Sequence, residues 1–215
     1  QTLVFQARDM SYQLTVPALQ RSLQLLDRAI ALDPNYARAY AIKSFVVNNL
    51  ASAERTPADQ ARGRQQALEI ARTALSIAAN LPIARSALAF AYQLTLRLPE
   101  AVREHRAALP PASGNPDATR NYGWTLSSIV GGRGDALRFV DEALALDPLN
   151  WVSHLAHVDA LFNARRYAEG VRYSLKLKQD SPDLFKFPDL LGHSLLMLGR
   201  TREAALAFGQ VGNPS

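Results

Sequence analysis

The fold of this chain is decided by residues 147–211, which read DPLNWVSHLAHVDALFNARRYAEGVRYSLKLKQDSPDLFKFPDLLGHSLLMLGRTREAALAFGQV. Asp147-Pro148 closes one segment and Ser181-Pro182 closes the next, and the two prolines are 34 residues apart. Gly199 marks a tight turn between two short helical segments, because glycine tolerates the backbone conformation that ends a helix. The stretch therefore predicts a pair of short helices that repeats along the chain.

The same period runs through the rest of the sequence. A small residue of the second helix recurs at Ala204, Gly170, Ala136, Ala101, Ala67 and Ser22, with steps of 34, 34, 35, 34 and 45 residues. Mostly small or apolar residues follow each of these anchors after four and after seven positions. Offsets of four and seven lie on one face of a helix. The pattern predicts six helix pairs.

Several residues of the last repeat are typical of a known family. Leu191-Gly192 lies in the first helix, and Ala204 is followed four positions later by Phe208 in the second. Together with the 34-residue period and the boundary prolines, these residues resemble the tetratricopeptide repeat family. The resemblance implies an all-α fold, an α-α superhelix of about twelve helices in six antiparallel pairs. It implies one domain over residues 1–215, with repeats at about 2–34, 36–79, 83–113, 115–148, 149–182 and 183–213.

Two places depart from a regular ladder. The step from Ser22 to Ala67 is too long, and the excess falls around residues 51–60. Thr56-Pro57 is typical of an N-cap followed by proline in the first helical turn, so we expect a loop at 51–56 and a helix at 57–78. The insertion is either surface decoration or an elbow that contacts a partner.

The second departure is the proline-rich connector at residues 110–116, which is either a hinge or a long turn between repeats. The preserved ladder favours the turn. Asn115 is expected to cap the following helix, with Pro116 in its first turn, and Asp135 is expected to cap the helix after that. The glycines at 131–134 do not form a phosphate loop, because they follow a helical segment and no Lys-Ser/Thr comes after them.

Composition excludes several classes of protein. The net charge is +5, and the excess of basic residues lies in the first half of the chain. It indicates either a solvated surface or a mildly basic face that prefers acidic partners. No cluster of Lys and Arg with interleaved aromatic residues is present, so we expect no nucleic-acid partner. The absence of cysteine excludes disulfides.

No apolar run approaches the roughly 20 residues that span a bilayer, and no signal segment is visible. The sequence starts at Gln1 rather than Met, so we expect a piece of a longer protein. We expect a cytoplasmic location, or a periplasmic one if the parent protein carries a membrane anchor.

The sequence offers little for catalysis. His154 and His157 are three positions apart on one helix and could face one metal ion, but no third ligand is evident. Paired acids such as Glu100 and Glu104 fall on outer helix surfaces, where their pKa values would not be tuned for acid–base work. We therefore expect no metal, no cofactor and no enzymatic activity in this segment.

The family resemblance implies that first helices line the concave side of the solenoid. Extrapolating it assigns partner contacts to Arg38, Ile42, Phe45, Asn49, Arg85, Tyr92, Leu96, Leu155 and Asp159, with Ala89, Val152 and Ala156 beside them. This mixture of apolar, arginine and asparagine side chains suits an extended or helical peptide of some acidic character.

The expected function is a protein–protein interaction module that binds a peptide or domain in its groove. Residues 25–41 (LLDRAIALDPNYARAYA) and 141–151 (DEALALDPLNW) resemble repeats that follow effector domains in bacterial signalling proteins, such as class III nucleotide cyclases and winged-helix regulators. That resemblance implies a regulatory or sensory arm acting on an effector domain of the same chain. The alternatives are a stand-alone adaptor or homo-oligomerisation module, and a ligand-binding helical domain or enzyme.

Overall fold

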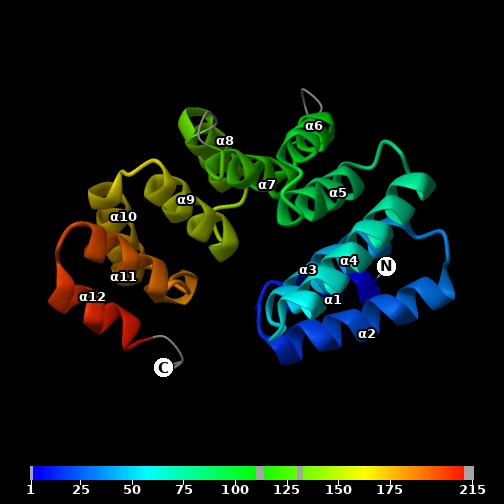
Figure 1. Ribbon diagram of the computed structural model, residues 1–215, viewed down its shortest axis with the longest axis horizontal. Helices are drawn as coiled ribbons and strands as arrows, with labels where there is room; N and C mark the ends of the chain where they lie inside the picture. Colours follow the sequence, from blue (N-terminus) through cyan, green and yellow to red (C-terminus); the bar gives the residue numbers. More distant parts are fainter. Residues whose placement is uncertain (1, 110–113, 130–132, 211–215) are drawn as a thin grey trace. The chain divides into compact units, whose positions relative to one another are not determined.

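The computed structural model describes residues 2–109, 114–129 and 133–210. Within these residues the chain forms twelve α-helices, one short 3-10 helix and no β-strand. The all-α fold predicted from the 34-residue ladder is thereby confirmed. Figure 1 shows the helices following one another as antiparallel pairs joined by short turns.

The chain divides into two compact units, residues 1–113 and 114–215. Unit 1 contains α1 (Thr2–Ser11), α2 (Val16–Leu32), α3 (Ala37–Ser52), α4 (Pro57–Ile77), α5 (Pro82–Leu94) and α6 (Leu98–Ala108). In this unit α3 is central, because it packs on α1, α2, α4 and α5. Each helix pair thus buries its apolar face against the next pair, as expected of a repeat array.

Unit 2 contains α7 (Pro116–Ser127), α8 (Arg133–Leu146), α9 (Trp151–Asn163), α10 (Tyr167–Asp180), α11 (Pro188–Met197) and α12 (Thr201–Phe208). A 3-10 turn, Pro182–Leu184, lies between α10 and α11. Here α9 holds the central place, since it packs on α7, α8, α10 and α11.

The predicted anchor residues all lie at helix–helix contacts. Ser22, Ala67, Ala101, Ala136, Gly170 and Ala204 are buried. Small side chains let the backbones approach, and two contacts add a hydrogen bond between helices: the Ser22 hydroxyl donates to the Ala7 carbonyl, and the Ser44 hydroxyl donates to the Ala67 carbonyl, both at 2.8 Å. The register read from the sequence is therefore the register of the packing.

The helix ends test the capping predictions. The Thr56 hydroxyl accepts a hydrogen bond from the Asp59 amide at 3.1 Å, and α4 starts at Pro57. The Asn115 side chain accepts from the Ala118 amide at 3.1 Å. Both caps are confirmed. Asp135 is not a cap, because α8 begins at Arg133 and Asp135 lies inside the first turn. Residues 110–113 of the connector and glycines 131 and 132 lie outside the described residues.

Within the described residues, four turns inside helix pairs use the left-handed backbone region. The residues are Leu14, Leu96, Arg165 and Gly199, with φ of 52°, 59°, 60° and 72°. Each sits between the first and the second helix of its pair. This conformation reverses the chain in a few residues, and only glycine adopts it without steric cost.

Candidate functional site

Three of the predicted partner residues share one face of α3. Arg38, Phe45 and Asn49 are spaced by seven and four positions, and all three are partly exposed. Arg38 forms no ion pair within the described residues. The Phe45 ring centroid lies 5.5 Å from that of Phe90 on α5, and the Asn49 amide donates to the Phe45 carbonyl at 2.8 Å. This α3 surface thus offers a cation, an aromatic pair and an amide with unused hydrogen-bonding capacity.

Two predicted residues of unit 1 are core residues instead. Ile42 is 3% exposed and packs with residues of α1 and α2, and Tyr92 is 8% exposed. The Arg97 guanidinium lies 4.3 Å from the centroid of the Tyr92 ring. Their assignment to a partner-contacting surface is corrected, because both side chains are used in helix packing. The neighbouring Ala89 is buried as well.

Arg85 and Leu96 occupy unexpected places. The Arg85 guanidinium forms an ion pair with Glu104 of α6 at 3.1 Å, so its charge is compensated within its own helix pair. Leu96 is 84% exposed, but it lies in the turn after α5 rather than on the helix. The contact of Arg85 with a partner stays a prediction, and any such contact would compete with Glu104 for the guanidinium.

In unit 2 the predicted pair Leu155 and Asp159 lies on α9, and both are partly buried; their neighbours Val152 and Ala156 are core residues. Asp159 accepts hydrogen bonds from the Asn163 amide at 3.0 Å and from the Ser127 hydroxyl at 3.3 Å. Burial raises the pKa of Asp159, while hydrogen bonds from Ser127, Trp124 and Asn163 oppose that shift.

The hydrogen-bond partners of Asp159, Ser127 and Asn163, were not predicted from the sequence. Asp159 and Asn163 stand at the repeat positions that Phe45 and Asn49 hold in unit 1, each 114 residues later. The recurring asparagine was therefore a readable signal. Ser127 could not be found this way, because it comes from another repeat.

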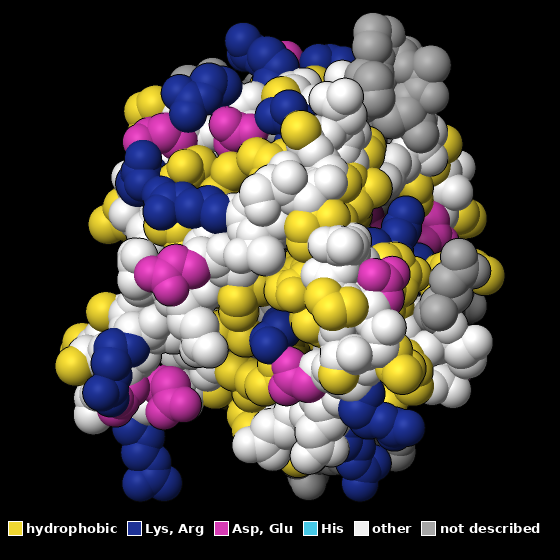
Figure 2. Space-filling model, turned by 90° about the vertical axis from the view of Figure 1, so that its right-hand side faces the viewer, with side chains coloured by type: hydrophobic (Ala, Val, Ile, Leu, Met, Phe, Trp, Pro, Cys, Tyr) yellow, Lys and Arg dark blue, Asp and Glu magenta, His cyan; other side chains and the backbone are white. Residues whose placement is uncertain are grey.

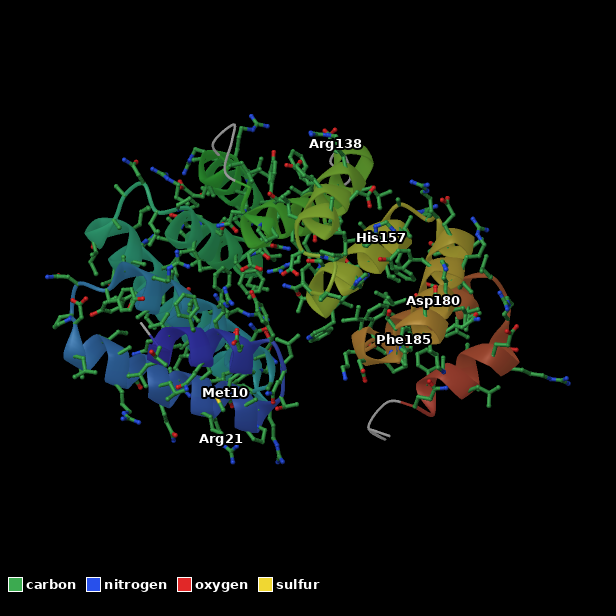
Figure 3. The ribbon with its side chains drawn as sticks, turned by 180° about the vertical axis from the view of Figure 1, so that it is seen from behind. Met10, Arg21, Arg138, His157, Asp180 and Phe185 are labelled. Atoms are coloured by element: carbon green, nitrogen blue, oxygen red, sulfur yellow. The ribbon has the colours of Figure 1, made fainter. Side chains whose placement is uncertain are left out.

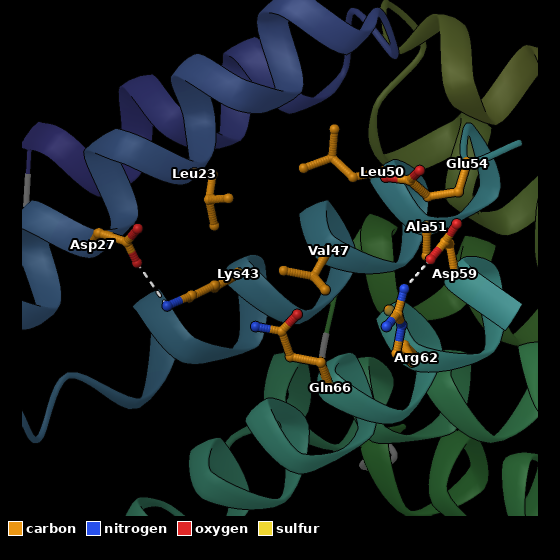
Figure 4. A pocket seen from close by; sticks show the side chains of 11 residues that line it. Leu23, Asp27, Lys43, Val47, Leu50, Ala51, Glu54, Asp59, Arg62 and Gln66 are labelled. Atoms are coloured by element: carbon orange, nitrogen blue, oxygen red, sulfur yellow. Dashed lines mark hydrogen bonds and ion pairs between the residues drawn. The ribbon is translucent and has the colours of Figure 1, made fainter.

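A hollow of about 400 Å³ lies between α2, α3 and α4 of unit 1. Figure 4 shows two ion pairs at this hollow, one between α2 and α3 and one within α4. Lys43 of α3 meets Asp27 of α2 at 2.6 Å, and Arg62 of α4 meets Asp59 one turn earlier. The Glu54 carboxylate also lines the hollow and forms no ion pair within the described residues. The insertion read from the sequence supplies Glu54 and Asp59, so it builds one wall of this hollow.

Helices α3 and α4 approach very closely beside this hollow. A Cβ atom on Gly63 would lie 2.5 Å from the Cβ of Ala51, which is shorter than side chains allow. Gly63 is thus required by the close approach of the inserted segment to α3.

A second hollow of about 470 Å³ lies between α8, α9 and α10 of unit 2. His157 is seen on α9 in Figure 3. Its Nδ1 lies 2.8 Å from Asp141 of α8, and its ring stacks on Tyr173 of α10 with centroids 4.4 Å apart. Burial lowers the pKa of His157, and the nearby Asp141 carboxylate opposes that shift.

The neighbouring His154 fixes the orientation of Tyr173. The His154 Nε2 lies 2.9 Å from the carbonyl of Pro148, which can only accept, so Nε2 carries the proton. Nδ1 then accepts from the Tyr173 hydroxyl at 2.5 Å. Burial raises the pKa of Tyr173 to about 12, which keeps the hydroxyl protonated. Both histidines therefore take part in hydrogen bonds and ring packing between helices.

The two hollows hold equivalent places in the repeat. Their matching residues on the first two helices are Leu23 and Leu137, Asp27 and Asp141, Lys43 and His157, and Val47 and Leu161, each pair separated by 114 residues. On the third helix, Gly63 matches Arg166 and Gln66 matches Glu169, counted from the anchors Ala67 and Gly170. An acidic residue bridging to the next helix is thus a shared feature.

Charged groups elsewhere are scattered. On the face shown in Figure 2, Lys and Arg side chains lie in separate groups, several of them beside Asp or Glu. In the described parts of the chain, no three His, Asp or Glu side chains come together as metal ligands would. None of the helices that the structure describes is both long and apolar enough to cross a membrane.

Comparison with known proteins identifies the architecture. The sequence matches no protein-family model and no curated protein. A tetratricopeptide repeat protein from Parabacteroides merdae ATCC 43184 superimposes with a TM-score of 0.61 and 18% identity, over 100% of this chain and 80% of that one. TTC0263, a thermophilic TPR protein of Thermus thermophilus, gives a TM-score of 0.60 and 19% identity, over 74% of this chain and 80% of that one.

A monomeric mutant of IFIT1, solved with m7Gppp-AAAA, gives a TM-score of 0.74 at 14% identity, over 91% of this chain and 46% of that one. Identities this low establish the fold alone. With the buried anchor ladder and the six helix pairs, they confirm at the level of architecture what the sequence motifs indicated. The chain has the tetratricopeptide repeat fold.

Proposed function

We propose that this chain is a protein–protein interaction module, and that it binds a peptide segment along the α3 surface of unit 1. The observation that carries the proposal is the spacing of Arg38, Phe45 and Asn49 on one partly exposed helix face. Each of these three side chains keeps a charge, an aromatic surface or a hydrogen-bonding group that the fold does not use fully. The fold itself is compatible with many functions, so the argument rests on this surface.

The chemistry of the three groups defines the partner. A guanidinium without an ion pair favours a carboxylate, since charge-assisted hydrogen bonds are the stronger ones. The aromatic pair of Phe45 and Phe90 accommodates an apolar side chain. Asn49 has one amide proton and its carbonyl oxygen left over, which suits a peptide backbone. The expected partner is therefore a peptide with an acidic residue near an apolar one.

The test is an array of synthetic peptides probed with the labelled protein. Arg38→Glu should abolish binding of acidic peptides, and Phe45→Ala should weaken binding of those with a bulky apolar residue. Arg21→Glu on α2 is the matched control, because Arg21 is exposed and forms no ion pair within the described residues. If Arg21→Glu weakened binding as much as Arg38→Glu, the α3 surface would be ruled out.

We propose in addition that this segment belongs to a larger bacterial signalling protein. The resemblance of residues 25–41 and 141–151 to repeats of bacterial signalling proteins supports a regulatory arm acting on an effector domain of its own chain. Reading the complete open reading frame around this sequence tests it: an adjoining cyclase or DNA-binding domain supports the arm. A reading frame without an effector favours the adaptor or homo-oligomerisation module, which sedimentation of the purified protein would distinguish. The cytoplasmic location stays a prediction.

A further inference from the structure

The hollow of unit 2 has an apolar floor. Leu161 is buried beneath it and Leu137 lines it from α8. The rings of His157 and Tyr173 complete the floor, with an interplanar angle of 35°. Such a floor favours an aromatic or aliphatic group, because stacked rings bury apolar area at little cost in conformational entropy.

Each of the two acidic groups of this hollow already has a hydrogen-bonding partner. Asp141 faces the His157 Nδ1 at 2.8 Å. Glu169 accepts two hydrogen bonds from the Arg166 guanidinium, both at 2.6 Å. A bidentate arginine–carboxylate pair is geometrically well defined, so the Glu169 carboxylate is held by Arg166.

Two cationic side chains of α10 line the edge of the hollow. Arg172 is exposed and forms no ion pair within the described residues; its charge only attracts Glu169 at longer range. Lys176 pairs with Asp180 one turn along α10, and both side chains are largely solvent-exposed. An exposed pair of this kind contributes little and exchanges readily. Arg172 and Lys176 follow one another after four positions and therefore share one helix face.

The equivalent hollow of unit 1 shows that this charge is not imposed by the repeat. Counted from the anchors Ala67 and Gly170, Glu69 stands where Arg172 stands, and Thr73 stands where Lys176 stands. The group left without an ion pair around the unit 1 hollow is the Glu54 carboxylate. The cationic edge is thus specific to α10.

We propose that the unit 2 hollow binds a ligand in which a carboxylate is joined to an aromatic or aliphatic group. The carboxylate meets Arg172 and Lys176, and the apolar group lies on the rings of His157 and Tyr173. The site is independent of the α3 surface, since it is built by other helices in the other unit. The same chemistry can come from a free organic acid or from an acidic side chain beside an apolar one in a peptide.

The experiment is an NMR titration of the isotope-labelled chain with three probes of one shape: benzoate, benzyl alcohol and benzylammonium. Benzoate should shift the signals of Arg172, Tyr173 and His157 in a saturable manner. The neutral and the cationic probe should leave them in place. Equal shifts with benzoate and benzyl alcohol, or benzoate shifts that map outside α8 to α10, would overturn the proposal.

Variants test the cationic edge directly. Arg172→Gln should weaken benzoate binding about tenfold, the size expected for one lost charge-assisted hydrogen bond. Lys176→Gln should weaken it less, because Lys176 is also attracted to Asp180. Arg202→Gln on α12 is the matched control, an exposed arginine outside the hollow. Unchanged affinity in Arg172→Gln, with a helical spectrum equal to that of the parent, would refute the site.

A second pair of probes separates the two sources. N-acetyl-phenylalanine represents a free acid, and a capped peptide with adjacent Phe and Glu represents a protein partner. Both should shift the Arg172 signal if the hollow serves a peptide, and only the free acid should do so if it serves a metabolite. Failure of both, together with failure of benzoate, would exclude the site. The Arg172 signal reports on the unit 2 hollow, whereas the difference between Arg38→Glu and the parent reports on the α3 surface, so this inference and the proposed function fail separately.

Discussion

The hollow of unit 1 and the hollow of unit 2 are built from the same repeat positions, but the group that forms no ion pair within the described residues is the Glu54 carboxylate in unit 1 and the Arg172 guanidinium in unit 2. Both place an aspartate of one second helix against a basic residue of the next first helix. In unit 1 that residue is Lys43, whose Nζ lies 2.6 Å from the Asp27 carboxylate. In unit 2 it is His157, whose pKa burial lowers. A repeat thus conserves where a bridge lies while its electrostatic character is set residue by residue.

The third helix that lines each hollow, α4 in unit 1 and α10 in unit 2, differs even more between the units. In unit 1 the inserted segment brings α4 against α3 at Gly63, and in unit 2 the matching position is Arg166. A close helix contact in one unit is therefore an open, charged edge in the other. Substitutions in both units should reveal this difference, and the change in stability should be greatest at His105.

The largest expected effect is a loss of stability in acid that is caused by His105 of α6. His105 stands at the repeat position that Leu26 and Val140 hold in other repeats. Burial lowers the pKa of His105 to about 3. The unfolded chain takes up a proton below about pH 6.5 and the folded chain does not, so stability is full above that pH and falls as the pH drops toward 3. At pH 4.5 the loss should be about 2–3 kcal/mol.

Urea unfolding followed by circular dichroism at pH 7 and pH 4.5 measures this loss. His105→Leu copies the residue of the equivalent slot and should remove most of the difference between the two pH values. His193→Gln is the control, because His193 lies on the exposed face of α11. An acid dependence as large in His105→Leu as in the parent would contradict the assignment.

Glycine-to-alanine exchanges should act with opposite sign in the two units. Gly63→Ala inserts a methyl group 2.5 Å from Ala51, and such overpacking costs about 1–3 kcal/mol. At Gly170 the nearest atoms would lie 3.7 Å away, an ordinary contact. Gly170→Ala should therefore stabilise by about 0.4–1 kcal/mol, because alanine restricts the unfolded chain. Thermal melts of both variants decide, and equal shifts would show that the α3–α4 approach is not tight.

The inserted segment depends on its cap. Thr56→Ala removes the hydroxyl that accepts from the Asp59 amide, and it should destabilise by about 1 kcal/mol. Thr56→Ser keeps the oxygen and should restore most of the loss. In unit 2 the N-cap residue of α10 is Arg166, and its side chain makes no capping hydrogen bond. A substitution there therefore has no capping bond to remove. A change in hydrogen exchange confined to the first turn of α4 would locate the effect.

The smallest effect comes from making unit 2 like unit 1. His157→Lys recreates the aspartate–lysine bridge beside Asp141, which is largely exposed, so stability at pH 7 should change by less than about 1 kcal/mol. The parent loses stability as the pH falls, because the lowered pKa of His157 delays its protonation in the folded state. The variant should lose that component. Parallel acid titrations of the parent and the variant measure it.

The fold could be predicted from the sequence because the residues that determine it act locally and recur with a fixed period. Ala204 and Gly170 are small where helices touch, and Thr56 and Asn115 cap within their own turns. Asp135 was misplaced because a polar residue in the first turn looks the same as one just before it.

The site was harder to read. Ile42 and Tyr92 failed as contact residues, because the family pattern gives the helix face but not the depth of each side chain. The hollows could not be foreseen at all: Asp141, His157 and Arg172 come from three helices, and only packing brings them to one place. Charges whose partners lie in another helix, such as Arg85 with Glu104, remain hidden for the same reason.

The turns have a consequence for how this array can change. Leu14, Leu96 and Arg165 hold a backbone region that costs an L-residue about 1–2 kcal/mol, whereas Gly199 holds the same region in the last pair without that strain. A glycine in place of each of these three residues should remove the strain and so raise the stability of its helix pair. An engineered array with these glycines should then tolerate destabilising substitutions in its helices.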